Sequence, residues 1–493
     1  MKNYSFIKKT GVAFLCQGIG LLYEFFIMIL AGRLLGANDY GTVLYAYTIL
    51  SICMIATKFG FESSIVSLMA RNDIVIEKKR WIVVFCLKVS LILSIIMVFA
   101  LNVFKPALLM LMGSGSGNYN ILRQMSPIII LETAGILFSA VLRGRKETFK
   151  YYIVYMHMQY GIRLASFATI WYLLNIKTIY ALIISYYISC LFMIFMAMFF
   201  LNDMHLFKGI KKRESLPFLF SLSVPLMLSG AITVVNSQID QYMIGYYLND
   251  ARLAIYSMAL NIGKVSSFAL VAINSIFAPL ISEYYYSGMM EKIKLLYSRT
   301  TKWVTCFNAV VMGVVSICAK DVLFLVGEEY VAGAEVLVII LIGETVNAMV
   351  GSVGYLNSMT GKAGYVLIAN LIAVVVNVFL NVQMIPTYGI AGAAIASSAS
   401  MIISNLLLFA LMFGHLRIQP YTFSYIGIII AFVTAFVPTL AVHSIWRQGN
   451  VSAIMICGLM FCFIFGIMAY LLVCEKNEKE FVKSYIRGAC FEK

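Results

Sequence analysis

The sequence predicts an all-α, polytopic membrane protein with about 14 transmembrane helices, arranged as two parallel six-helix lobes followed by two C-terminal helices. Three observations predict this fold. The chain of 493 residues is 62% hydrophobic and 12% charged, so a water-soluble domain could not bury its apolar surface. Apolar runs of about 20 residues, long enough to cross a bilayer, recur along the whole chain. Short sequence patterns from the first half return in the second half, which indicates an internal duplication.

The first two helices are expected to form a hairpin. Residues 11–31 are an apolar run, and a second run begins at Gly41. The segment 32–40 between them contains Gly, Asn and Asp, which favour a turn. We therefore expect two transmembrane helices that are joined by a short turn.

The remaining helices follow the same rule, an apolar run bounded by polar turns. The fourteen expected helices occupy residues 11–31, 41–68, 81–104, 121–142, 151–173, 178–201, 218–247, 254–281, 303–325, 334–358, 364–385, 389–413, 421–442 and 451–473. The expected domains are an N-terminal lobe (1–201), a basic cytoplasmic linker (202–217), a C-terminal lobe (218–413), helices thirteen and fourteen (414–473) and a cytoplasmic tail (474–493).

The duplication relates the two lobes. The turn around Gly245 can be laid over the turn around Gly32, and the pair Glu344-Thr345 over Glu132-Thr133. Because each lobe has an even number of helices, equivalent helices start on the same side of the membrane. The lobes are therefore parallel repeats, related by an axis along the membrane normal.

The charges predict the orientation. Most of the 37 Lys and Arg residues lie in the segments on one side of the expected helices, together with both termini. Since cytoplasmic loops collect Lys and Arg, both termini are expected in the cytoplasm. The net charge of +15 is thus explained by topology, and no nucleic-acid partner is expected.

The sequence carries no clear sign of a cleaved signal peptide, a disulfide or a metal site. The basic N-terminus precedes an apolar run that is too long for a signal peptide and has no small-residue cleavage site. The ten cysteines are scattered without a CxxC pair or a nearby His cluster, so neither disulfides nor metal sites are expected. No large outer loop carries clustered catalytic residues, so we expect a protein that is not an enzyme and has no cofactor.

Two basic residues are the main candidates for substrate binding. Arg163 and Lys264 lie near the middle of helices five and eight, one in each lobe. Charges inside the bilayer are costly and normally face a partner or a wet cavity, so a shared cationic cavity for an anionic substrate is expected. The alternative is a structural ion pair with a buried carboxylate. Lys88 is a third candidate, although it lies close enough to the helix end to reach the headgroups.

Acidic and amide residues are candidates for ion coupling or for lining the cavity. Glu132 and Glu344 are equivalent in the repeat, and buried carboxylates can exchange H+ or Na+, although they can equally clamp neighbouring helices by hydrogen bonds. Glu24 and Asp240 lie at similar depth, each about two turns before the outer end of the first helix of its lobe, and Asn236 shares a helix face with Asp240. Asn261 is a further candidate.

Three turns carry a family resemblance. Residues 32–41 (GRLLGANDYG) resemble the GRxLGxxxYG signature of Wzx-type flippases of bacterial polysaccharide repeat units, and residues 385–396 (IPTYGIAGAAIA) resemble their IPxYGIxGAAIA turn. Residues 325–330 (LVGEEY) are similar to the turn between their ninth and tenth helices. The resemblance implies the MOP superfamily, which includes MATE drug exporters and lipid II flippases and has a two-lobed fold around a cavity.

The resemblance also implies a function. It predicts a flippase that carries undecaprenyl-pyrophosphate-linked oligosaccharide, for O-antigen of lipopolysaccharide or for capsule, across the bacterial cytoplasmic (inner) membrane by alternating access coupled to H+ or Na+. Membrane lipid, a polysaccharide polymerase and a chain-length regulator are the expected partners. The alternatives are a lipid II flippase and a MATE-type multidrug antiporter.

Overall fold

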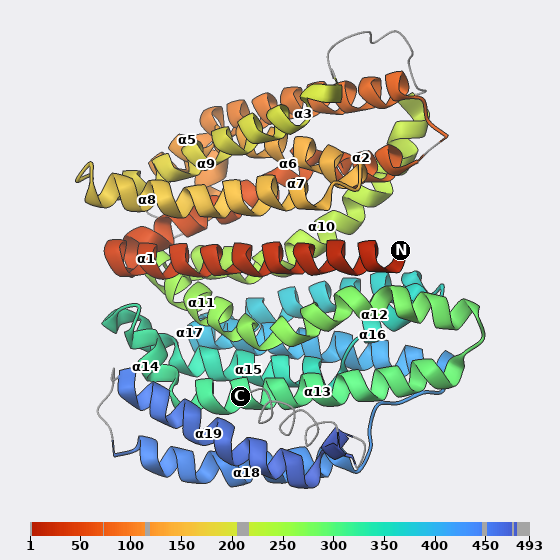
Figure 1. Cartoon of the computed structure of the whole chain (residues 1–493). Helices are drawn as coiled ribbons and strands as arrows, with labels where there is room; N and C mark the ends of the chain where they lie inside the picture. The colour runs from red at the N-terminus through yellow and green to blue at the C-terminus, as the bar shows by residue number, and fades with distance from the viewer. Residues whose placement is uncertain are drawn as a thin grey trace, which may run out of the picture. The chain divides into compact units, whose positions relative to one another are not determined.

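The computed structural model describes residues 2–71, 73–113, 119–204, 216–445, 451–475 and 478–480, and these are helical almost throughout (Figure 1). The helices form two compact units. The first consists of Met1–Met258 with Val378–Ala393, and the second of Ala259–Asn377 with Ala394–Lys493. The predicted linker (202–217) and tail (474–493) fall largely outside the described residues, and the predicted lobe boundaries stay predictions.

Helix α6 lies at the centre of the first unit. It packs against α2, α3 and α9, and most of its 17 residues are buried. The helices that begin in this unit are α1 (Lys2–Lys58), α2 (Phe61–Ala70), α3 (Ile76–Val103), α4 (Lys105–Met112), α5 (Tyr119–Met125), α6 (Ile128–Gly144), α7 (Thr148–Tyr152), a π-helix (Ile153–Gly161), α8 (Ile162–Tyr172), α9 (Ile179–Phe200), a 3₁₀ turn (Asn202–Met204), α10 (Leu216–Tyr247) and α11 (Asp250–Gly263).

In the second unit, α18 and α19 lie side by side and both pack on α13 (Figure 1). Gly313 of α13 makes this approach possible, because a Cβ there would lie 2.1 Å from the ring of Phe461 in α19. The elements that follow α11 are a 3₁₀ turn (Lys264–Ser267), α12 (Phe268–Tyr286), α13 (Met290–Ile317), α14 (Ala319–Phe324), a 3₁₀ turn (Glu328–Gly333), α15 (Ala334–Val350), α16 (Val353–Met359), α17 (Ala363–Leu416), α18 (Ser424–His443) and α19 (Val451–Leu472).

The apolar helices make the chain a multi-pass membrane protein. Ten helices of the described part are long and apolar enough to cross a bilayer, or eleven if the bent pair Tyr119–Met125 and Ile128–Gly144 is one span. This count does not confirm the expected number of about 14. Two of the long helices are each two helices joined at a kink, at Gly36 in α1 (φ 77°, ψ 169°) and at Gly389 in α17 (φ 60°, ψ −137°). Both kinks fall in turns that the sequence predicts.

Some predicted boundaries are wrong. The helix expected at 303–325 begins at Met290, because the polar stretch before residue 303, which the prediction assigned to a loop, continues the helix. The helix expected at 254–281 begins at Asp250 and contains a 3₁₀ turn. The helix expected at 334–358 is divided between α15 and α16, where Gly351 adopts a positive φ of 73°.

Candidate functional site

A cluster of polar side chains lies inside the first unit, away from solvent. Glu132 on α6 is 2% exposed, and its Oε1 accepts hydrogen bonds of 2.8 Å from the Tyr47 hydroxyl and the Gln159 amide. Arg163 on α8 is 4% exposed, and its guanidinium carbon lies 3.7 Å from the centre of the Tyr186 ring. Side chains from α1, α6, α9 and the continuous stretch of π-helix and α8 thus surround one carboxylate and one guanidinium.

This cluster is only partly satisfied. The buried atoms Glu132 Oε2, Gln159 Oε1, Arg163 Nε and Arg163 Nη2 have no hydrogen-bond partner among the described residues. Burying a charged group without partners costs several kcal/mol, and the face of an aromatic ring offsets only part of that cost. The cluster therefore keeps unused donors on Arg163 and an unused acceptor on Glu132.

The backbone next to this cluster is unusual. Residues Ile153–Gly161 form a π-helix of 9 residues, and Gln159 lies within it. The wider turn of a π-helix is rare and occurs frequently at functional sites. Gln159 and Arg163 are four residues apart, so one helix face presents both side chains to Glu132.

Glu344 has a similar environment in the second unit. It lies on α15, is 8% exposed, and accepts hydrogen bonds from the Ser267 hydroxyl and the Asn347 amide. Each of the two glutamates is therefore a buried carboxylate that accepts one hydrogen bond from a hydroxyl and one from an amide. The pairing of Glu132 with Glu344 in the repeat stays a prediction.

Asp240 is the third buried carboxylate among the predicted residues. It lies on α10, is 3% exposed, and accepts hydrogen bonds from the Asn381 amide (2.7 Å) and the Tyr256 hydroxyl (3.1 Å). Both of these donors are neutral. Like the two glutamates, Asp240 is held by dipoles in an apolar environment.

The other predicted residues are less buried, and Glu24 among them lies close enough to Tyr160 and Tyr186 for its charge to act on both. Lys264 is exposed in the 3₁₀ turn of the second unit, which ends at Ser267, the residue that donates a hydrogen bond to Glu344. Three further predicted residues are also exposed and one is half-buried. They are Lys88, Glu24, Asn236 and, half-buried, Asn261. A common cavity for Arg163 and Lys264 stays a prediction.

Sequence reasoning missed the neutral partners of these carboxylates. It considered charged residues first, whereas Tyr47, Gln159 and Asn381 carry no charge and lie in long apolar runs. The spacing of Gln159 and Arg163 by four residues was the available signal. A separate cavity of about 500 Å³ in the first unit is lined by Asn102, Arg123 and other residues, and none of the predicted residues lines it.

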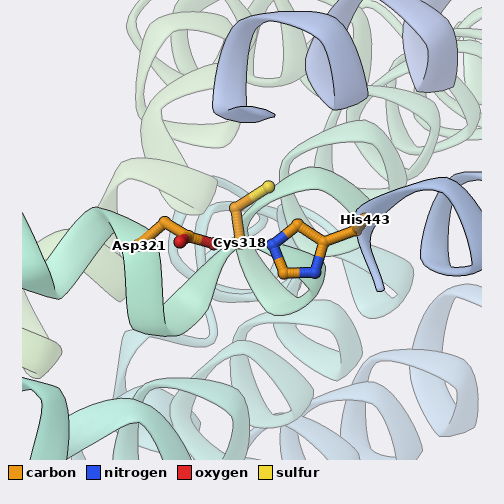
Figure 2. A group of neighbouring side chains, drawn as sticks. All are labelled: Cys318, Asp321 and His443. Atoms are coloured by element: carbon orange, nitrogen blue, oxygen red, sulfur yellow. Dashed lines mark hydrogen bonds and ion pairs between the residues drawn. The ribbon is translucent and has the colours of Figure 1, made fainter. Parts of the chain in front are cut away.

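One group of described residues could hold a metal ion. The ligand atoms of Cys318, Asp321 and His443 lie close together in the second unit (Figure 2). The sequence predicted no metal site, because these residues do not form a recognised spacing.

Comparison with known proteins identifies related sequences. The family model described as "Polysaccharide biosynthesis protein" matches residues 6–285, and the model "MatE" matches residues 225–383. The "Probable low-salt glycan biosynthesis flippase Agl15" of Haloferax volcanii is 23% identical over 190 residues, which are 38% of this chain and 40% of that protein. The chain thus aligns with less than half of the length of this relative.

Solved structures share the fold. The structure "Lipid II flippase MurJ, inward closed conformation" superimposes with a TM-score of 0.75 at 14% identity and covers 93% of this chain and 97% of its own. An inward-facing multidrug resistance MATE family transporter of the MOP superfamily gives a TM-score of 0.63 at 16% identity, covering 81% and 94%. The predicted MOP fold is confirmed, and the assignment to the Wzx branch stays a prediction.

Proposed function

The chain belongs to the polysaccharide biosynthesis protein family, and from this membership we propose that it is a flippase for an undecaprenyl-pyrophosphate-linked oligosaccharide. The match over residues 6–285 carries the proposal. Two of the similar proteins bear the name flippase, one of glycan biosynthesis and one of lipid II. The turn motifs around Gly36 and Gly389 favour the O-antigen or capsule branch over lipid II.

Arg163 is the proposed ligand for the pyrophosphate. Its charge is permanent, and its Nε and Nη2 are buried N–H donors that no protein acceptor uses among the described residues. Two N–H groups of a guanidinium fit two oxygens of a phosphate, and charge-assisted hydrogen bonds of this kind are the strong ones. In the resting protein Glu132 offsets the charge, and the arriving pyrophosphate takes over that role. Lys264 and Lys88 are the proposed secondary cations.

The buried carboxylates are the proposed coupling sites. Glu132, Glu344 and Asp240 accept hydrogen bonds from neutral hydroxyl and amide groups. Such a carboxylate can bind H+ or Na+ in place of a hydrogen bond from a neutral group, and it binds the ion more tightly when water is excluded. An ion with different affinities for the two access states would shift the transport equilibrium. Glu24, Asn236 and Asn261 remain the proposed polar lining of the path.

The proposal is tested with full-length protein in liposomes that contain undecaprenyl-pyrophosphate-linked oligosaccharide. Transfer is measured as the fraction of labelled headgroup that an added, impermeant glycosidase can cleave. We expect transfer by the wild type and a transfer rate at least tenfold lower in Arg163→Ala. Arg163→Lys should keep partial activity, because it keeps the charge but loses the paired N–H donors of the guanidinium. Arg123→Ala, which removes an exposed arginine bonded to Asn102, is the matched control and should transfer normally.

Folding must be checked in the same samples, because Arg163 packs on Tyr186. If the variants and the wild type elute alike as monodisperse protein in size-exclusion chromatography, a loss of transfer reflects lost binding and not lost structure. Full transfer by a folded Arg163→Ala protein would refute the role of Arg163. Absence of transfer by the wild type with every lipid-linked oligosaccharide tested would refute the flippase assignment.

Export of cationic compounds is the second candidate function, because the MatE model matches residues 225–383. The same liposomes, loaded with ethidium instead of lipid-linked sugar, distinguish the two. A MATE-type antiporter would move ethidium against its gradient when H+ or Na+ is supplied. We expect no such movement, since a buried arginine in the path would repel a cation.

A further inference from the structure

Three side chains that commonly bind metals meet at one end of the helices in the second unit, as Figure 2 shows. Cys318 lies between α13 and α14, Asp321 is in the first turn of α14, and His443 is the last residue of α18. One thiol sulfur, one carboxylate oxygen and one imidazole nitrogen all lie within 4.8 Å of one another. The fold brings His443 to this place from 122 residues beyond Asp321.

The cluster is mostly shielded from solvent and has a second thiol beside it. Cys318 is 0% and Asp321 is 1% exposed, while the side chain of His443 is 20% exposed and forms the accessible edge. The Cys457 thiol on α19, also fully buried, neighbours the Cys318 thiol. A hydrogen bond of 2.6 Å between His443 Nε2 and Asp321 Oδ2 holds the pair in the metal-free protein.

We propose that Cys318, Asp321 and His443 form a binding site for a divalent cation of the zinc class. Sulfur, imidazole nitrogen and carboxylate oxygen are the ligands that zinc accepts, and three protein ligands leave a fourth tetrahedral position. Water fills that position. None of the residues proposed for transport contributes a ligand to this site.

The charges favour this assignment. A Zn²⁺ ion with one thiolate and one carboxylate is neutral, so the metal would balance the charge of the buried Asp321 carboxylate, which is hydrogen-bonded to His443. On binding, Cys318 releases its proton to solvent. The ring proton of the neutral imidazole moves from Nε2, where it bonds Asp321, to Nδ1, so that Nε2 can donate its lone pair to the metal. Neighbouring ligand atoms of a tetrahedral zinc site lie about 3.3–3.7 Å apart, so the His443–Asp321 contact opens by about 1 Å.

A metal at this site would fasten α18 to the junction of α13 and α14. The two C-terminal helices α18 and α19 pack on α13 through apolar side chains around Phe461. The metal would add a polar cross-link at the end of that apolar interface. Its effect is therefore expected in the stability of the second unit and not in the transport cycle.

The site is tested on the full-length protein in detergent, after removal of any affinity tag and stripping with EDTA. Dialysis against Zn²⁺ should leave one zinc per chain by inductively coupled plasma mass spectrometry. Dialysis against Co²⁺ should give the thiolate-to-cobalt charge-transfer absorption of a sulfur-ligated tetrahedral site. We expect at least a tenfold loss of zinc affinity in Cys318→Ser and in His443→Gln. Cys306→Ala, which removes another buried thiol of α13, should bind as the wild type does.

His443→Gln also guards against a folding defect, because its amide can still donate to Asp321 while it is a poor zinc ligand. Zinc should raise the melting temperature of the wild type and of Cys306→Ala, and leave that of His443→Gln unchanged. Zinc retained equally by all the variants would show adventitious binding and overturn the proposal. Less than one zinc per chain in a folded wild type, without a cobalt–thiolate band, would also overturn the proposal. The cluster would then be only a hydrogen bond between Asp321 and His443.

Discussion

Replacement of Gly389 by alanine should destabilise the protein at the kink of α17. Gly389 adopts φ 60° and ψ −137°, a backbone conformation that a residue with a Cβ rarely adopts. It belongs to the motif that resembles the Wzx-type turn, and no atom beyond its chain neighbours and the adjoining helical backbone lies within 4 Å of its hypothetical Cβ. The expected defect is therefore backbone strain alone, without a steric clash against a neighbour.

The magnitude follows from a matched glycine in the same helix. A non-glycine residue in such a conformation costs about 1–3 kcal/mol. Gly414 also has open space around its Cβ position, but its φ is not positive, so Gly414→Ala should stabilise the helix by about 0.5–1 kcal/mol. The two alanine variants should thus differ by about 1.5–4 kcal/mol in the free energy of unfolding.

The measurement is thermal unfolding of both variants in the same detergent, followed by intrinsic fluorescence and by loss of monodisperse protein. Gly389→Ala should melt several degrees below the wild type, and Gly414→Ala at or above it. Equal melting temperatures for the two variants would refute the positive φ at Gly389 as the reason for glycine in this motif.

Three further predictions concern packing, pH and coupling. Gly41→Ala should lower the melting temperature by an amount that corresponds to about 1–3 kcal/mol, because the new Cβ would lie 1.8 Å from the backbone oxygen of Asp250; a melting curve that matches the wild type would contradict this close approach. Hydrogen bonds from Arg145 lower the pKa of Asp203, so their stabilisation is complete above the ordinary pKa of 3.8 and is lost as the pH falls through the lowered value. Asp203→Asn should therefore cost less than about 1 kcal/mol at pH 7 and nothing at strongly acidic pH, measured as melting temperature against pH; a difference that persists in acid would exclude this cause. Glu344→Gln should fold but transfer lipid-linked sugar at a rate that no longer depends on the H+ or Na+ gradient, and unchanged gradient dependence would remove this residue from the coupling proposal.

The positions of most helices could be predicted from the sequence because a bilayer imposes a length on each apolar run. The kinks at Gly36 and Gly389 fall in turns marked by glycine, proline and polar residues, which are local signals. The beginning of α13 at Met290 could not be predicted by the same rule. A helix can extend beyond the membrane through charged residues, whereas a prediction from hydropathy alone assigns such residues to a loop.

The candidate site was predictable only in part. Intramembrane charge identified Glu132, Arg163 and Asp240, because burial of an ionisable group is costly whatever the fold. The neutral side chains that complete their environment depend on which helices meet, and no sequence window contains that information. Gln159 reaches Glu132 from another helix, and Asn381 reaches Asp240 from 141 residues away.

The arrangement of charges supports the binding role that we propose for the cluster of Glu132 and Arg163. Ion pairs such as Arg145–Asp203 lie at helix ends, where the two side chains are in direct contact at 2.6 Å. Glu132 and Arg163 lie in the same buried cluster and yet form no direct ion pair; each carries a polar atom without a partner among the described residues. A pair retained for stability alone would close this gap, since an incompletely satisfied buried charge destabilises the fold. The unused hydrogen-bonding capacity is instead what a site needs if a phosphate and a small cation are to enter and leave it.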